Sequence, residues 1–285
     1  MLNLTRMEFR RLFRDKSVYI TLASFLGFIL IALITMKLVT DQNLLSFATE
    51  NGFEFTAEDQ ADAASFLSST ISDFVSNLLF SGGLMVCFSA IFCSLSTCDD
   101  FASGFGKNIF SYYPDRGYYI VSKIVTHCAI NAMFILALTA ASIILFKICG
   151  FPNHLGDPLK MVLMLLIGWV ALIPLVAQNM LLCMLIRNAA VASILSILCG
   201  LGAVAGVLET IAGLFGIHVA QFFPPYLVMM SPYISGSSGT GSLLSFAVSQ
   251  NGLGTNLLLS VFASLLWTLI YIWLSKKVLS KKDIC

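Results

Sequence analysis

The sequence predicts an all-α membrane protein with six transmembrane helices, and three observations support this fold class. The 285-residue chain is 58% hydrophobic and only 11% charged, whereas an average soluble domain carries about 25% charged residues. Its mean hydropathy is +0.90. Six stretches are apolar over about 20 residues, the length that an α-helix needs to cross a bilayer.

The six predicted spans form one domain, residues 1–285, and follow one another at 18–39, 76–97, 124–147, 161–186, 189–208 and 254–275. Only Arg187 and Asn188 separate the fourth span from the fifth, so we expect a tight helical hairpin there. A seventh apolar region, 211–230, is interrupted by Pro224 and Pro225. Because proline breaks a helix, we expect short re-entrant helices before the sixth span, within an outer region at 209–252.

Lysine and arginine positions orient these spans, because cytoplasmic loops are enriched in both residues. An even number of spans places both termini on one side, and that side receives 13 of the 16 basic residues. These are Arg6, Arg10, Arg11, Arg14, Lys16, Lys107, Arg116, Lys123, Arg187, Lys276, Lys277, Lys281 and Lys282. Both termini are therefore predicted to be cytoplasmic. The net charge of +1 gives no indication of a nucleic-acid partner.

Residues 1–17 are too charged to cross the membrane, and we expect them to form an interfacial helix. At 100° per residue, Leu2, Phe9, Leu12 and Phe13 fall on one side, and Arg6, Arg10 and Arg14 form a basic stripe beside them. Such a helix lies on the inner leaflet with its apolar side chains down and its arginines toward anionic lipid. The alternative is an ordinary cytoplasmic segment whose charges only set the topology.

The outer segment at 40–75 contains seven acidic residues and no lysine or arginine. Thr56 followed by Asp59 resembles a capping box, which predicts a helix that starts near Ala57 and continues toward the second span. The segment is either a solvated acidic surface or a vestibule that attracts cations.

Few polar residues interrupt the spans. No chain of acids or histidines at helical spacing accompanies any of the polar residues His127, Asn131, Gln178, Asn179 and Glu209. We therefore expect the amides to form hydrogen bonds between helices and expect no proton relay. Gly202 and Gly206 have the GxxxG spacing that allows close helix packing. The eight cysteines form no CxxC pair, which favours buried thiols over disulfides or a metal site.

The longest polar stretch between two spans is residues 98–123, CDDFASGFGKNIFSYYPDRGYYIVSK. Gly104 and Gly106 permit a sharp turn, and Pro114 ends any helix before it. A short helix around 101–111 is therefore expected. It would carry the apolar residues Ile109 and Phe110, whose exposure would be unfavourable unless a partner covers them.

This stretch resembles the loop after the second span of ABC-2 type permeases, the membrane subunits of bacterial ABC exporters. The matching residues are Ser103, Gly104, Lys107, Asn108, Pro114, Arg116, Tyr119 and Lys123. The interfacial helix, the six spans and the basic C-terminal tail are similar too, so the resemblance covers essentially the whole chain. It implies that 98–123 contains a cytoplasmic coupling helix that docks on a nucleotide-binding protein through these residues, together with Ile109 and Phe110.

The resemblance also implies a function. The chain would be a multi-pass permease in a bacterial plasma membrane, paired with a second permease chain, with the second and fifth spans facing the pathway. No GxxxxGK[ST] motif occurs, so ATP and magnesium would bind to a separate cytoplasmic ATPase and no cofactor to this chain. The cargo would be peptides or amphipathic molecules, as in antimicrobial peptide export or immunity; the alternative is a multidrug or lipid exporter.

Two other classes of protein fit less well. An intramembrane enzyme could use a serine of 231–242 with His127 or His218 as its base, but His127 is predicted at the opposite face, and a serine nucleophile needs its base within hydrogen-bond reach. A secondary transporter would show inverted repeats or charged residues near mid-membrane, and we find neither in the sequence.

Overall fold

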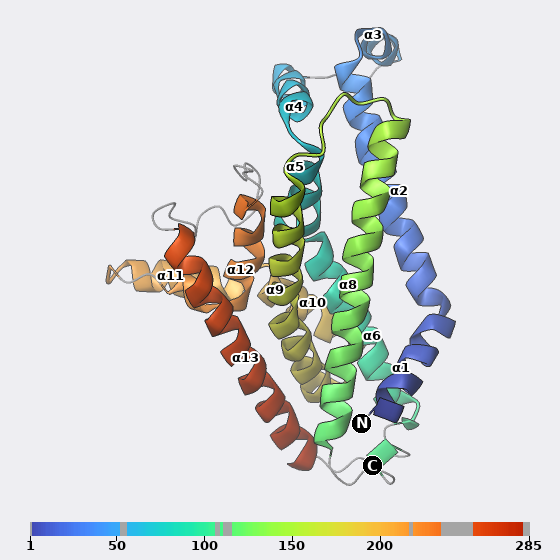
Figure 1. Cartoon of the computed structure of the whole chain (residues 1–285). Coiled ribbons are helices and arrows are strands. Elements are labelled where there is room, and N and C mark those ends of the chain that lie inside the picture. The colour runs from blue at the N-terminus through green and yellow to red at the C-terminus, as the bar shows by residue number, and fades with distance from the viewer. Residues whose placement is uncertain are drawn as a thin grey trace.

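The computed structural model describes residues 2–51, 56–105, 109–110, 116–216, 219–234 and 253–281. Within these ranges every regular element is helical. Five helices are long and apolar enough to cross a membrane, namely α2 (Lys16–Thr40), α6 (Leu84–Ala102), α8 (Gly117–Ile148), α9 (Pro158–Ile186) and α13 (Leu253–Lys281). The predicted all-helical class is thus confirmed, with five or six candidate spans (Figure 1).

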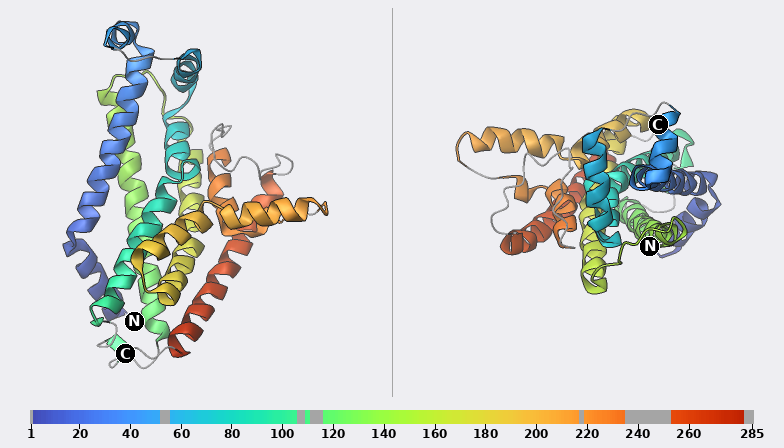
Figure 2. Two further views of the ribbon diagram at one scale, coloured as in Figure 1. Left: turned by 180° about the vertical axis from the view of Figure 1, so that it is seen from behind. Right: turned by 90° about the horizontal axis from the view of Figure 1, so that it is seen from above.

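The sixth candidate is a bent pair of helices. α10 (Ala189–Gly200) and α11 (Ala203–Gly213) qualify as a span only together, and they meet at an angle of 42°. Figure 2 shows α11 extending sideways from the rest of the bundle. Gly202 occupies the break with φ 82°, in the left-handed region that favours glycine. The predicted fifth span, 189–208, is thus interrupted at Gly202, and Gly202 and Gly206 do not form a GxxxG face on one continuous helix.

α9 lies at the centre of the bundle, because α6, α8, α10 and α13 all pack against it. Its buried face includes Met164, Ala171, Leu172 and Leu175. Gly168 allows the closest approach, since a Cβ there would lie 2.2 Å from Cζ of the buried Phe80. Asn188 begins α10 by accepting hydrogen bonds from the first amides of that helix, which forms the tight hairpin between the fourth and fifth spans.

The outer segment is folded rather than a plain loop. It contains α3 (Gln42–Glu50), α4 (Ala57–Ser68), α5 (Ile71–Ser76) and the π-helix η1 (Asn77–Ser81). Phe66 packs against Phe74, Phe146 and Phe151 with ring centroids 5.3–5.7 Å apart. We call this part, together with the ends of α2 and α8 beside it, the outer head, after the side of the membrane that the sequence predicts for it. It lies at the upper end of Figure 1.

The predicted helix of this segment starts at Ala57, as expected, but it is not continuous up to the second span. The chain breaks between α4 and α5, where Thr70 and Asp73 form a reciprocal capping box, and it breaks again at Gly83, with φ 71°, before α6. The first interruption separates Ala57 from the second span. The second lies within the predicted span 76–97, whose α-helix α6 starts only at Leu84. This capping box starts α5 at Thr70, whereas the side chain of Asp59, which the predicted box needs, lies outside the described residues.

Residues 220–234 form short helices, as the two prolines predicted. They are η2 (Ala220–Phe222), α12 (Pro224–Met230) and η3 (Ser231–Ile234). The Glu209 carboxylate accepts 2.7 Å hydrogen bonds from the amides of Val219 and Ala220, so it fixes η2 to α11. The re-entrant placement of these helices in a bilayer stays a prediction.

α1 (Leu2–Arg14) and the last turns of α13 lie at the same end of the bundle (Figure 1). Leu4 of α1 and Leu279 of α13 belong to one buried cluster with Tyr119 and Ile120. This arrangement fits an even number of spans. On α1, Leu4, Glu8 and Leu12 are buried against the bundle, whereas Phe13 is 41% exposed and Phe9 is half-buried. The placement of this helix on the membrane surface stays a prediction.

Candidate functional site

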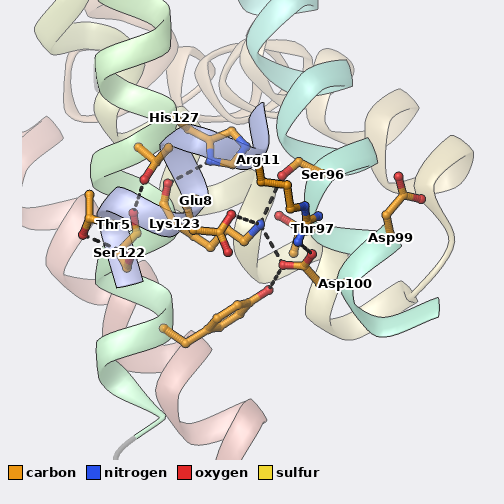
Figure 3. A network of polar contacts seen from close by, with 12 residues as sticks. Thr5, Glu8, Arg11, Ser96, Thr97, Asp99, Asp100, Ser122, Lys123 and His127 are labelled. Carbon is orange, nitrogen blue, oxygen red and sulfur yellow. Dashed lines mark hydrogen bonds and ion pairs between the residues drawn. The ribbon is translucent and has the colours of Figure 1, made fainter. Parts of the chain in front are cut away.

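Four charged side chains meet inside the bundle at the end where α1 lies. Lys123 Nζ is 2.9 Å from Oε2 of Glu8 and 2.7 Å from Oδ2 of Asp100. Arg11 pairs with Oδ1 of Asp100. Lys123, Glu8 and Asp100 are 0–1% exposed. We call these four residues the ion-pair cluster (Figure 3).

The ion-pair cluster ties three elements together. Glu8 and Arg11 come from α1, Asp100 from the end of α6 and Lys123 from the start of α8. Two positive and two negative charges balance, and burial of an unbalanced charge would cost several kcal/mol or more. Half-burial of the Arg11 guanidinium lowers its pKa, but the charge and hydrogen bond of Asp100, together with the charge of Glu8 and the interaction with Tyr119, outweigh that effect and raise the pKa of Arg11 above its ordinary value.

Hydrogen bonds extend the ion-pair cluster toward α6. The Tyr119 hydroxyl donates to Oδ2 of Asp100 at 2.8 Å, and Lys123 Nζ donates to the Ser96 hydroxyl at 3.2 Å. Glu8 is less well satisfied: among the described residues, its carboxylate has only the ion pair with Lys123 and no hydrogen bond of good geometry. Lys123 is thus the cation that balances the buried negative charge of Glu8.

A polar stripe continues from the ion-pair cluster along α8. Lys123, His127 and Asn131 recur every four residues and are all buried. His127 Nδ1 lies 2.8 Å from the carbonyl oxygen of Lys123, and Asn131 donates a 3.0 Å hydrogen bond to Ser89 of α6. His127 and Asn131 are therefore not isolated. The predicted helix-to-helix hydrogen bond of Asn131 is present.

Three arginines hold the aromatic residues of the 98–123 loop. Arg187 lies 6.0 Å from the Phe101 ring, Arg11 4.9 Å from Phe105 and Arg116 5.7 Å from Phe110. Each distance is within the range of a cation–π interaction. Arg116 also donates a hydrogen bond to the carbonyl of Leu279 at the end of α13. The described parts of the loop are thus attached to the α9–α10 turn, to α1 and to α13.

The structure places the predicted loop residues in three different environments. Ser103 is exposed at the end of α6, and Gly104 follows with φ 70°. Ile109 is 6% exposed, and Phe110 packs edge-on against Tyr119 at 5.2 Å. We expected both apolar residues to be exposed on the loop. Ile109 is instead buried, and Phe110 is only partly exposed.

Tyr119 and Lys123 are fully buried against the protein's own bundle, so they are not exposed for the contact with a partner that the resemblance implied. Lys107, Asn108 and Pro114 lie outside the described residues.

Sequence reasoning missed Glu8, Arg11 and Asp100 as partners. One signal was present: Glu8 is the only acid among the basic residues of 1–14, and it precedes Arg11 by three positions, which places both on one helix face. Glu8 is far from Asp100 and Lys123 along the chain, so the sequence alone did not indicate that these residues are in contact.

Together these features define a multi-pass helical membrane protein with a polar loop that is tied to its spans by buried charges. Residues 4–203 match the family model described as ABC-2 family transporter protein. The chain belongs to this family. Searches of curated proteins and of solved structures found no match.

Proposed function

We propose that the chain is the permease subunit of an ATP-driven exporter and that a separate cytoplasmic ATPase docks on the 98–123 loop. Family membership supports the class of transporter. The observation that supports the docking site is the ion-pair cluster at the base of this loop. Asp100 precedes the loop's exposed residues and Lys123 follows them, so any displacement of the loop acts on three helices at once.

The proposed docking surface is the exposed part of the loop. Ala102 and Ser103 are exposed at the end of α6, whereas Ile109 and Tyr119 are buried against the protein's own bundle. The buried residues would hold the loop in place, and the exposed ones would contact the ATPase. ATP and magnesium would bind to that partner, because the sequence has no P-loop motif.

A bulky side chain on this surface tests the docking. We expect Ser103→Trp to reduce the amount of ATPase that copurifies with the tagged chain by about tenfold, equivalent to about 1.4 kcal/mol of binding. The measurement is ATP hydrolysis in the eluate, normalised to permease. Ser68→Trp, an exposed serine in the outer head, is the matched control. Equal hydrolysis with Ser103→Trp and wild type would place the ATPase elsewhere.

We also propose that both termini are cytoplasmic, with the outer head on the other side of a bacterial plasma membrane. The basic residues Arg6, Arg10 and Arg14 of α1 support this orientation through the bias of lysine and arginine toward the cytoplasm.

Thiol labelling tests the orientation. In a variant without the eight cysteines, we expect Ser68→Cys to react with a membrane-impermeant maleimide on intact cells and Ser103→Cys to react only after lysis. Both serines are exposed, so the bilayer alone should decide the difference. Labelling of Ser103→Cys on intact cells would reverse the orientation and remove the docking proposal with it.

The transported molecules are proposed to be cationic or amphipathic peptides, handled by two permease chains. The support is the acidity of the outer head. Asp41, Glu50 and Asp62 lie in or beside α3 and α4, and no lysine or arginine occurs between residues 40 and 75. Such a field is screened beyond about 8 Å at physiological salt, so it acts on molecules already close to the outer head.

Neutralisation of the acids tests the cargo. Glu50, Glu54, Glu58, Asp59 and Asp62 are replaced together by Gln or Asn. We expect cells that express this variant and its ATPase to become several-fold more sensitive to cationic peptides at low salt, with a smaller difference at high salt because screening weakens the field. Resistance that is unchanged at every salt concentration would leave the peptide preference without support.

A further inference from the structure

Two cysteines of neighbouring spans meet near the end of the bundle where the 98–123 loop begins. Cys98 belongs to α6 and Cys183 to α9, and together with Ala192 of α10 they form one buried cluster. The side chains of Cys98 and Cys183 are hydrogen-bonded to each other. Cys98 is 5% exposed and Cys183 is fully buried, and neither is in a disulfide. A reduced pair of thiols in contact therefore lies between α6 and α9.

The thiol of Cys183 lies against one face of α6. Ser94 is one turn before Cys98, on the same helix face, and it too interacts with Cys183 through its side chain. Cys93, also on α6, has a different neighbour on α9: its Sγ lies 3.9 Å from the carbonyl oxygen of Val176. Val176 comes seven residues before Cys183, a rise of about 10 Å along the helix. Cys98 is thus better placed than Cys93 to react with Cys183.

The thiol pair directly precedes the loop that we propose as the docking site. Cys98 comes two residues before Asp100, a member of the ion-pair cluster. On α9, Cys183 is one turn before Arg187, which lies 6.0 Å from the Phe101 ring. A covalent bond between the two sulfurs would therefore join α6 to α9 one turn inside an existing contact, and it would fix the position from which the loop starts.

We propose that Cys98 and Cys183 are a modification site, at which oxidation by hydrogen peroxide forms a disulfide that holds the start of the 98–123 loop against α9. The sulfur of Cys98, the more accessible of the two, attacks one peroxide oxygen and becomes a sulfenic acid. The other oxygen leaves with the thiol proton as water. The sulfur of Cys183 then attacks the sulfenic sulfur and displaces a second water. Two thiols lose two electrons, and the peroxide that accepts them is reduced to two waters.

Contact between the thiols determines the product. A sulfenic acid that has no thiol beside it is oxidised further, to acids that reductants do not reverse, whereas an adjacent thiol converts it to a reversible disulfide. Cys183 occupies the place of such a resolving thiol. The formation of the disulfide does not depend on the proposed transport function, but any effect on the ATPase rests on it.

A variant that keeps only Cys98 and Cys183 tests the bond. The other six cysteines are replaced by serine, and the purified protein in detergent is treated with hydrogen peroxide. We expect the intact mass to fall by two hydrogens and a crosslinked peptide to contain both residues. The unfolding temperature should rise by about 5 °C, because a crosslink between distant parts of the chain restricts the unfolded state. Dithiothreitol should reverse all three changes.

The matched control keeps Cys93 and Cys183 and has serine at position 98. Both of its thiols are fully buried and lie on the same two helices, but no hydrogen bond joins them in the part of the chain that the structure describes. We therefore expect no crosslink in the control. Amide hydrogen exchange over residues 98–104 should slow several-fold on oxidation of the first variant and stay unchanged in the control.

Three results would overturn the proposal. If Cys98 gains oxygen atoms or stays unmodified while no crosslink forms, Cys183 is not its resolving partner. If the control crosslinks equally, the reaction reflects random collisions. If the crosslink forms and hydrogen exchange over 98–104 does not change, the disulfide does not hold the start of the loop.

ATP hydrolysis by a copurified ATPase distinguishes this inference from the proposed function. In the complex with the two-cysteine variant, we expect peroxide to lower hydrolysis several-fold and dithiothreitol to restore it. A chain that forms the disulfide but copurifies with no ATPase would contradict the proposed function and support the modification site. A chain that copurifies with the ATPase but forms no disulfide would do the reverse.

Discussion

Replacement of Lys123 by methionine is expected to lower the free energy of unfolding by about 3–5 kcal/mol, the usual cost of removing one partner from a buried ion pair. Methionine keeps much of the volume of the lysine side chain but not its charge. Asp100 would keep Arg11 and Tyr119 as partners, whereas Glu8 would keep none that the structure describes. The measurement is the thermal unfolding of purified protein in detergent.

A double variant shows whether the loss comes from uncompensated charge. Glu8→Gln combined with Lys123→Met restores neutrality, and we expect it to recover most of the stability lost in Lys123→Met. Lys147→Met, at an exposed lysine of the same helix, is the control and should have little effect. If the double variant is as unstable as Lys123→Met alone, packing and not charge balance explains the role of Lys123.

Substitution of Gly168 by alanine is expected to be the second most damaging change, because the new methyl group would overlap the Phe80 ring. The added Cβ would lie 2.2 and 2.3 Å from two ring carbons, closer than real contacts allow. Phe80 is 2% exposed, so the ring has no open space to enter. Overpacking of this kind typically costs about 1–3 kcal/mol.

The size of Phe80 can be reduced to test this explanation. Gly168→Ala combined with Phe80→Leu should unfold at a higher temperature than Gly168→Ala alone. Gly27→Ala is the matched control, since nothing lies within 4 Å of a Cβ at that position, and it should be neutral or slightly stabilising because alanine favours helices. An equal loss in both alanine variants would show that contact with Phe80 is not the cause.

The sequence predicted the spans well because twenty apolar residues in a row have few other uses. The predicted 161–186 and the observed Pro158–Ile186 agree closely, as do 18–39 and Lys16–Thr40. The bend at Gly202 was missed because hydropathy stays high on both sides of it. Hydropathy measures the environment of a segment and does not report its backbone angles.

The candidate site was predicted only as a polar loop, and the buried ion pairs at its base were not predicted. Tyr119 and Lys123 were named from the resemblance, but as contacts of a partner, whereas the structure buries both. Polar residues in a membrane protein are readily interpreted as surface groups. Glu8 and Lys123 show the other solution, in which opposite charges far apart in sequence neutralise each other inside the bundle, and pairing of that kind depends on the tertiary fold.

The length of α8 gives the molecule a mechanical property. The helix has 32 residues and is about 48 Å long, well beyond the roughly 30 Å of a hydrocarbon core. Lys123 lies near its first turns, and Phe146, near its last, packs in the outer head. One continuous helix thus connects the ion-pair cluster to the outer head. A rigid rotation of about 5° about one end would move the other by about 4 Å over that length, so we expect a small shift at the loop to displace the outer head without any change within the helix.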